Sequence, residues 1–122
     1  MAQVLCTGVD GTLLQTRRMM LERAGHTVTT VTLEDELREA CETTKFDVAV
    51  IGQSVSPRQK RRVADLIRNH CPTAKVLELY SPFEGAAIDD ADDSLCVPAD
   101  VPDDFVNRVA QLAAPEKRRK HS

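Results

Sequence analysis

Few side chains that could do chemistry lie near one another in this sequence of 122 residues. Asp10 is a lone carboxylate in a glycine-rich loop, Gly8–Gly11, which follows a short apolar run. The cysteines, at positions 6, 41, 71 and 96, include no Cys-x-x-Cys pair. They therefore indicate neither a zinc site nor a disulfide framework, and we expect buried free thiols. The histidines, at positions 26, 70 and 121, are equally dispersed, so the sequence predicts no metal site, no cofactor and no set of catalytic residues.

The stretch Phe46–Ser56 predicts the central strand of a parallel sheet. Asp47 is followed by the apolar run Val48–Ile51, and Gly52 ends that run. A short apolar run between breakers is typical of a strand that is buried on both faces. Ligands of such sheets bind outside the carboxyl ends of the strands, so any chemistry is expected at Gly52–Ser54. Gly52 has no side chain to supply it.

Strand-like and helix-like segments alternate along the chain. Strands are predicted at residues 3–7, 27–31, 48–51, 75–79 and 94–97, and helices at 13–24, 33–41, 57–70, 83–88 and 102–112. Alternation implies parallel pairing with right-handed crossovers. The predicted fold is α/β, a flavodoxin-like, three-layer, doubly wound sheet of five parallel strands in the order 2-1-3-4-5. This order places Gly8–Gly11 beside Gly52–Ser54.

Local signals mark several helix ends and surfaces. Ser56, followed by Pro57 and Gln59, predicts a capped helix start, and Thr32 with an acid three residues later predicts another. The basic residues of the third helix are expected on an exposed face; they are Arg58, Lys60, Arg61 and Arg62. The acidic residues at 89, 90, 92 and 93 predict a solvated turn.

The charge is distributed unevenly between two parts of the chain. The net charge is −3, but residues 115–122 carry +3, so the remaining body carries −6. We expect one domain over residues 1–114 and a basic, disordered tail over 115–122. An acidic body with only 3% aromatic residues predicts no nucleic-acid partner. No apolar run approaches the roughly 20 residues that span a membrane, and no signal peptide is evident, so we expect a cytoplasmic protein.

Three segments resemble the receiver domain of bacterial response regulators, the CheY-like family. They are LLQTRRMMLERAGHTV, FDVAVIG and DDADDSLCVPADVPDDFVNRV, and the resemblance spans residues 3–113. It implies a bacterial role in two-component signal transduction. A working receiver holds Mg²⁺ with two acids after strand one and an aspartate after strand three, and that aspartate accepts the phosphoryl group. A hydroxyl after strand four and a lysine after strand five neutralise the phosphoryl oxygens.

This chain departs from the receiver pattern at each of those positions. The resemblance places the acid pair on Gly8 and Val9, the acceptor on Gly52, the hydroxyl on Tyr80 and the lysine on Val97. A shift of one residue would bring Asp10 into the acid pair. Pro98 is retained, and the resemblance implies a cis bond between residues 97 and 98. The resemblance therefore indicates a pseudo-receiver without phosphorylation chemistry.

The leading hypothesis is a stand-alone signalling module, not an enzyme, which acts through a signalling protein or output domain on another chain. A homodimer through the face between strand four and the last helix is also possible in such a module. One alternative comes from Val9–Leu14, which resembles part of the haloacid dehalogenase signature. Asp10 would be its acid/base residue, but Gly8 stands in the place of the nucleophile. A second alternative is a small anion or nucleotide binder, because Gly8 and Gly52 let the backbone approach a ligand closely.

Overall fold

The computed structural model describes residues 2–98 and 103–114, and within them strands and helices alternate. The elements are β1 (Gln3–Thr7), α1 (Gly11–Arg23), β2 (Thr27–Val31), α2 (Glu34–Thr43), β3 (Val48–Ile51), α3 (Pro57–His70), β4 (Lys75–Tyr80), β5 (Asp93–Cys96) and α4 (Asp104–Ala113). Every neighbouring pair of strands is parallel, and the order is β2-β1-β3-β4-β5. The predicted fold class and strand order are confirmed. The tail, residues 115–122, and the expected helix start at Pro102 lie outside the described residues.

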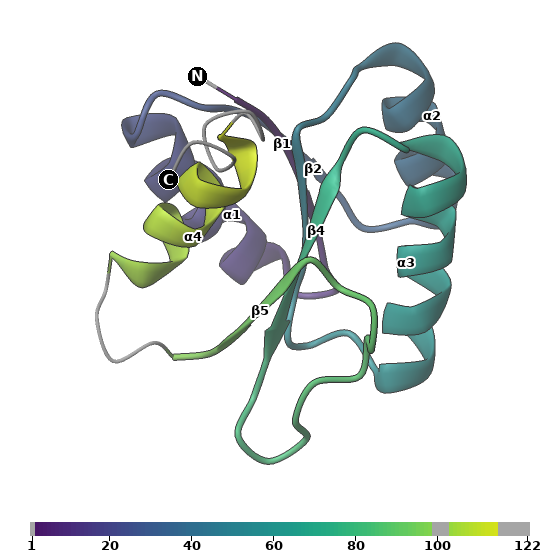
Figure 1. The fold of residues 1–122 in the computed structure, drawn as a ribbon, viewed down its shortest axis with the longest axis vertical. Coiled ribbons are helices and arrows are strands. Elements are labelled where there is room, and N and C mark those ends of the chain that lie inside the picture. The colour runs from purple at the N-terminus through teal and green to yellow at the C-terminus, as the bar shows by residue number, and fades with distance from the viewer. Residues whose placement is uncertain (1, 99–102, 115–122) are drawn as a thin grey trace, which may run out of the picture.

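Helices cover both faces of the sheet, which makes three layers. Figure 1 shows α1 and α4 on one face and α2 and α3 on the other. Successive side chains of a strand point to opposite faces, and β1 illustrates this: Val4 and Cys6 pack toward α1 and α4, whereas Leu5 packs toward α2 and α3. The two apolar clusters meet at the sheet, so β1, β3 and β4 are buried on both faces.

Of the two predicted helix caps in the described residues, one is confirmed and the other is displaced by one residue. The Ser56 hydroxyl accepts a hydrogen bond from the Gln59 N–H at 3.3 Å, as the capping pattern predicts. The predicted capping role of Thr32 is wrong by one residue, because Leu33 occupies the N-cap position of α2. A leucine side chain cannot accept a hydrogen bond, and Glu36 instead reaches back to accept from the backbone N–H groups of Thr32 and Leu33, both at 3.1 Å. These bonds lower the pKa of Glu36.

The expected helix at residues 83–88 is wrong: a turn-rich segment without a helix joins β4 to β5. Two backbone N–H groups of this segment, those of Ala87 and Ile88, donate to the Glu78 carboxylate at 2.7 and 2.9 Å. Gly85 also has a φ of 72°, which is outside the helical region. Bonds to a buried side chain therefore replace the bonds that a helix would make within its own backbone.

Lys60 is buried, which corrects the expectation that it lies on an exposed basic face. Its ammonium contacts the Glu78 carboxylate at 2.9 Å, and the side chains of the pair are 2% and 0% exposed. The same ammonium donates to the carbonyl of Leu79 at 2.7 Å. Lys60 and Glu78 thus tie α3, β4 and the segment after β4 into one buried polar cluster.

Cys41 and Cys71 form a disulfide, so the expectation of four free thiols is wrong for this pair. The two Cα atoms are 5.3 Å apart, and the bond joins the last turn of α2 to the residue that ends α3. Widely spaced cysteines can pair when two helices end beside each other, a juxtaposition that spacing along the sequence does not reveal. Cys6 and Cys96 are free, as expected.

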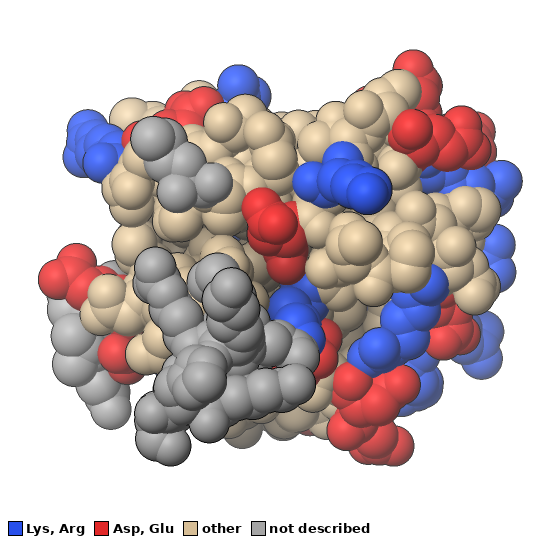
Figure 2. Space-filling model, turned by 45° about the horizontal axis from the view of Figure 1, so that its top comes forward, with Lys and Arg blue, Asp and Glu red and all other residues tan. Residues whose placement is uncertain are grey.

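The described surface carries charges of both signs. Figure 2 shows Lys and Arg side chains interspersed with Asp and Glu on the face that it presents. No helix among the described residues is long and apolar enough to cross a membrane.

Candidate functional site

The carboxyl ends of β1 and β3 lie side by side and bring two glycines together. Thr7 is in register with Ile51, and the N–H of Gly52 donates to the Thr7 carbonyl at 3.0 Å. A Cβ placed on Gly52 would lie 3.7 Å from the Cα of Gly8. Gly8 and Gly52 are therefore neighbours at the point where the strand order reverses, as the predicted topology requires.

The other positions of the expected phosphorylation pocket lie at the same edge of the sheet. The N–H of Val97 donates to the carbonyl of Tyr80 at 2.8 Å, and the Val97–Pro98 bond is cis, as the resemblance implied. Val9 follows β1 with its side chain 65% exposed. None of these positions supplies a carboxylate or a lysine ammonium.

Asp10 is the nearest acid in sequence to this edge, and it caps α1. Its carboxylate Oδ1 accepts hydrogen bonds from the backbone N–H groups of Thr12 and Leu13, at 3.0 and 3.2 Å. This is the ordinary N-cap arrangement, which satisfies N–H groups left free at a helix start. Asp10 has no second acid beside it at Gly8, so the dehalogenase-like pair of aspartates is absent.

Arg17, which the sequence reasoning did not select, occupies the centre of the site. It belongs to α1, and only 9% of its surface is exposed. Its Nη2 donates to Oε1 of Gln53, the residue after Gly52. A Cβ on Gly52 would lie 3.2 Å from Nη1 of Arg17, and also 3.2 Å from the carbonyl oxygen of Thr7. The guanidinium therefore fills space into which a side chain at position 52 would project.

The position of Arg17 could have been found from helical spacing. Leu14, Arg17 and Leu21 are the buried residues of α1, and they are three and four residues apart. Residues at this spacing share one face of a helix. A charged residue on that face is expected to enter the core or the edge of the sheet, and Arg17 does so.

The buried groups around Arg17 differ in charge. Burial lowers the pKa of Arg17, and the neighbouring Cys6 and Asp10 oppose that shift. A guanidinium nevertheless stays protonated in proteins. Burial raises the pKa of the Cys6 thiol to about 12, although Arg17 acts in the opposite direction. Arg17 is therefore a cation beside a neutral thiol.

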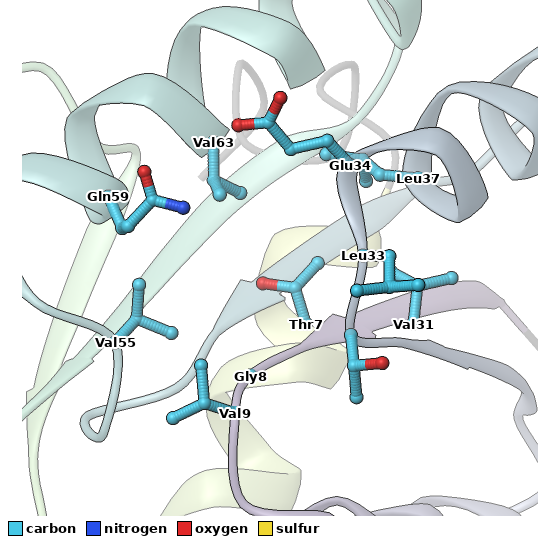
Figure 3. A pocket seen from close by; sticks show the side chains of 11 residues that line it. Thr7, Gly8, Val9, Val31, Leu33, Glu34, Leu37, Val55, Gln59 and Val63 are labelled. Atoms are coloured by element: carbon cyan, nitrogen blue, oxygen red, sulfur yellow. The ribbon is translucent and has the colours of Figure 1, made fainter.

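Two hollows flank the edge of the sheet. The smaller, of about 50 Å³, lies between the ends of β1 and β2 and the helices α2 and α3. Figure 3 shows its mostly apolar lining, to which Gln59, Glu34 and Thr7 add polar atoms. The larger, of about 400 Å³, lies on the opposite side of the sheet, between α1, α4 and the end of β5, and Arg17 and Gln53 contribute to its wall.

Metal ligands do not gather at either hollow. Across residues 2–98 and 103–114, no group of three His, Cys, Asp or Glu side chains could hold a metal ion. The site of this chain is instead a buried cation, a neutral amide and an apolar pocket.

Comparisons with known proteins connect this fold to receiver domains. No protein-family model matches the sequence, and no curated protein matches it. Among solved structures, the chain is similar to a response regulator receiver domain from Clostridium thermocellum, with 21% identity, 98% of each chain covered and a TM-score of 0.77. It is also similar to the receiver domain of the Francisella response regulator 1452, with 22% identity, coverage of 98% of this chain and 99% of that one, and a TM-score of 0.73.

A third similar structure holds a metal. It is the receiver domain of a Pseudomonas aeruginosa sensor histidine kinase, with magnesium coordinated in its active-site cleft. Here the identity is 12%, the coverage is 92% of this chain and 97% of that one, and the TM-score is 0.70. The chain therefore has the CheY-like fold of response regulator receiver domains.

Proposed function

We propose that this chain is a regulatory receiver-like module that signals through contacts with another protein and not by accepting a phosphoryl group. One observation carries the proposal. The resemblance to receivers places the acceptor at Gly52, and the Arg17 guanidinium lies 3.2 Å from where the Cβ of residue 52 would be. A cation at that point opposes Mg²⁺ by like charge, and glycine offers no oxygen nucleophile.

The proposal includes no catalytic activity. The carboxylate of Asp10 is engaged at the start of α1, and the pocket positions Val9, Tyr80 and Val97 offer no acid or ammonium to assist transfer. The partner would be a signalling protein or output domain on a separate chain, in a bacterial cytoplasm. Reducing compartments disfavour disulfides, so the thiol state of Cys41 and Cys71 in cells also tests this location.

Partner contact is proposed at the face from β4 to α4, the last helix, where receivers also dimerise. The segment between β4 and β5 adjoins this face and carries Phe83, whose side chain is 96% exposed. Large exposed apolar side chains are enriched where proteins associate. A second copy of the chain is one partner that this face could accept.

The phosphorylation test uses acetyl phosphate and beryllofluoride with Mg²⁺. We expect no phosphoryl adduct by intact mass spectrometry and no saturable amide shifts at Gly8–Asp10 or Gly52. A receiver with an intact acceptor serves as the positive control. The variant Gly52→Asp is also expected to stay unmodified, because Arg17 would pair with the new carboxylate. An adduct on a carboxylate of the unaltered protein would overturn the proposal.

The surface test compares two exposed apolar residues. Phe83→Ser is expected to weaken self-association or partner binding, measured by light scattering after size exclusion. Met19→Ser is the matched control, because Met19 is 45% exposed on α1, away from the proposed face. Equal effects of the two variants would contradict the assignment of the face.

A further inference from the structure

The pocket beside α1 and α4 combines an apolar wall with a polar end. Its volume is about 400 Å³, within the range of pockets that hold small molecules. The apolar part of its lining comes from Leu13, Met20, Leu79, Val97, Pro98 and Phe105. The polar part comes from Thr16, Arg17 and Gln53.

The charge at the polar end has Asp10 as an electrostatic neighbour, but it makes no ion pair among the described residues. Only 9% of the surface of Arg17 is exposed, and its hydrogen-bond partner is the neutral amide of Gln53. None of the carboxylates in residues 2–98 and 103–114 forms an ion pair with Arg17. Burying a charge is unfavourable unless it is paired, so Arg17 offers a ligand a buried cation that no described carboxylate contacts.

Gln53 is oriented to add to the same end. Its Oε1 accepts from Arg17, so its amide nitrogen is left to donate elsewhere. A guanidinium and an amide N–H together provide donors of the kind that a carboxylate accepts. The absence of a Cβ at Gly52 keeps this donor pair in place, since a Cβ there would crowd Arg17.

We propose that this pocket binds a small organic carboxylate with an apolar body. The carboxylate would accept hydrogen bonds from Arg17 and Gln53, and the body would pack against Leu79, Pro98 and Phe105. A single cation with an otherwise neutral lining matches one negative charge. Phosphate groups carry about 1.5 to 2 charges at neutral pH and have no apolar part, so they fit this pocket less well.

This site goes beyond the proposed function and does not depend on it. Partner contact was assigned to the segment after β4 and to the face toward α4, whereas the acid would lie between α1 and α4 at Arg17. Loss of acid binding would leave the phosphorylation test unaffected, and the reverse also holds.

The experiment titrates the full chain with 3-phenylpropionate and octanoate as probes, with 3-phenylpropionamide and inorganic phosphate as comparisons. Amide shifts in two-dimensional NMR spectra report the site. We expect saturable shifts at Gln53, Thr16 and Phe105 with the acids, and at least about tenfold weaker binding of the amide, because its oxygen accepts a hydrogen bond without the negative charge that strengthens a pair with guanidinium.

Two variants of neighbouring arginines separate charge from packing. Arg17→Met keeps an apolar side chain and removes the charge, and we expect at least about tenfold weaker binding of the acids. Arg18→Met is the matched control on α1, where Arg18 pairs with Glu22 at 3.2 Å on the surface, and it should bind as the unaltered chain does.

Several results would overturn the proposal. They are equal binding of acid and amide, unchanged binding in Arg17→Met, tighter binding of phosphate than of the organic acids, or no saturable shifts at the pocket with either acid. If Arg17→Met does not fold, the comparison of acid and amide on the unaltered chain decides the question by itself.

Discussion

Arg17 places a buried charge beside Gly52, at the point where the strand order reverses. The residue reaches that place because it lies on the inward face of α1, between Leu14 and Leu21. It fits there because Gly52 has no side chain. The two residues are complementary: Gly52 has no side chain, and the Arg17 guanidinium lies 3.2 Å from where a Cβ would be.

A stability prediction follows from the unpaired charge. Arg17→Met should raise the free energy of unfolding by about 1 kcal/mol, because desolvation of the cation is relieved while the apolar stem is kept. Urea unfolding followed by circular dichroism measures this. The matched substitution Arg18→Met, at an exposed ion pair, should change stability by less than about 1 kcal/mol. A clear loss of stability in Arg17→Met would show that the guanidinium is well compensated in the folded state.

At the scale of elements, the buried pair Lys60–Glu78 explains how a connection without a helix is held. Glu78 lies in β4, and its carboxylate accepts a hydrogen bond from the Lys60 ammonium of α3. It also accepts hydrogen bonds from two backbone N–H groups of the segment after β4. Removing one partner leaves a buried charge without compensation, which is more harmful than replacing both.

Lys60→Met is therefore expected to destabilise the fold by about 3–5 kcal/mol. The double variant Lys60→Met with Glu78→Gln should recover part of that loss, because glutamine carries no charge and its single oxygen can still accept one of the two backbone N–H groups. Arg62→Met is the control on α3, since its ion pair with Glu34 is exposed and should contribute at most about 1 kcal/mol. Similar losses for Lys60→Met and Arg62→Met in urea unfolding would contradict this view of the pair.

The disulfide joins α2 and α3 across 30 residues of sequence. Replacing Cys41 and Cys71 by alanine should lower the free energy of unfolding by about 2–4 kcal/mol, because the unfolded chain regains freedom. The control replaces the free thiols Cys6 and Cys96, and that variant should still lose stability when a reductant is added.

A count of thiols under denaturing conditions checks the bond directly. The unaltered chain purified without reductant should react at the two free cysteines, Cys6 and Cys96, and at no other. Reaction at all four cysteines would show that Cys41 and Cys71 remain thiols in solution.

At the scale of the whole molecule, the chain has the layers and strand order of receiver domains, and Gly8, Gly52 and Arg17 lie together at one edge of its sheet. In the correspondence that we propose, the acids that hold Mg²⁺ in a working receiver fall on Gly8, Val9 and Gly52, and the Arg17 guanidinium lies beside Gly52. Fold and chemistry are separable in this way because the sheet is stabilised by its apolar faces, whereas the chemistry depends on loop residues.

Millimolar Mg²⁺ is therefore expected to leave the midpoint of thermal unfolding unchanged, relative to a sodium salt of equal ionic strength. Like charges at short range disfavour a dication beside Arg17. A rise in the midpoint specific to Mg²⁺, and lost in Asp10→Asn, would contradict the prediction and would place a metal site at the start of α1.

The sequence by itself determined the sheet and its strand order. The apolar run Val48–Ile51, the breakers around it and the alternation of periodicities predicted the parallel order correctly. Those signals are local, because a strand buried on both faces must be apolar throughout and its ends must carry breakers. The same strand order predicted that Gly8 lies beside Gly52, and the structure places them side by side.

Only the tertiary structure decided which side chains around the sheet are buried or paired. Four features depend on a partner distant in sequence. They are the burial of Arg17, the Lys60–Glu78 pair, the Cys41–Cys71 bond and the missing helix at 83–88. A charged or polar residue shows its type in the sequence but not its partner, and burial becomes possible only when a partner or a pocket is supplied by the fold. The sequence shows that residue 52 has no side chain, and the tertiary structure shows that the Arg17 guanidinium lies in the space beside it.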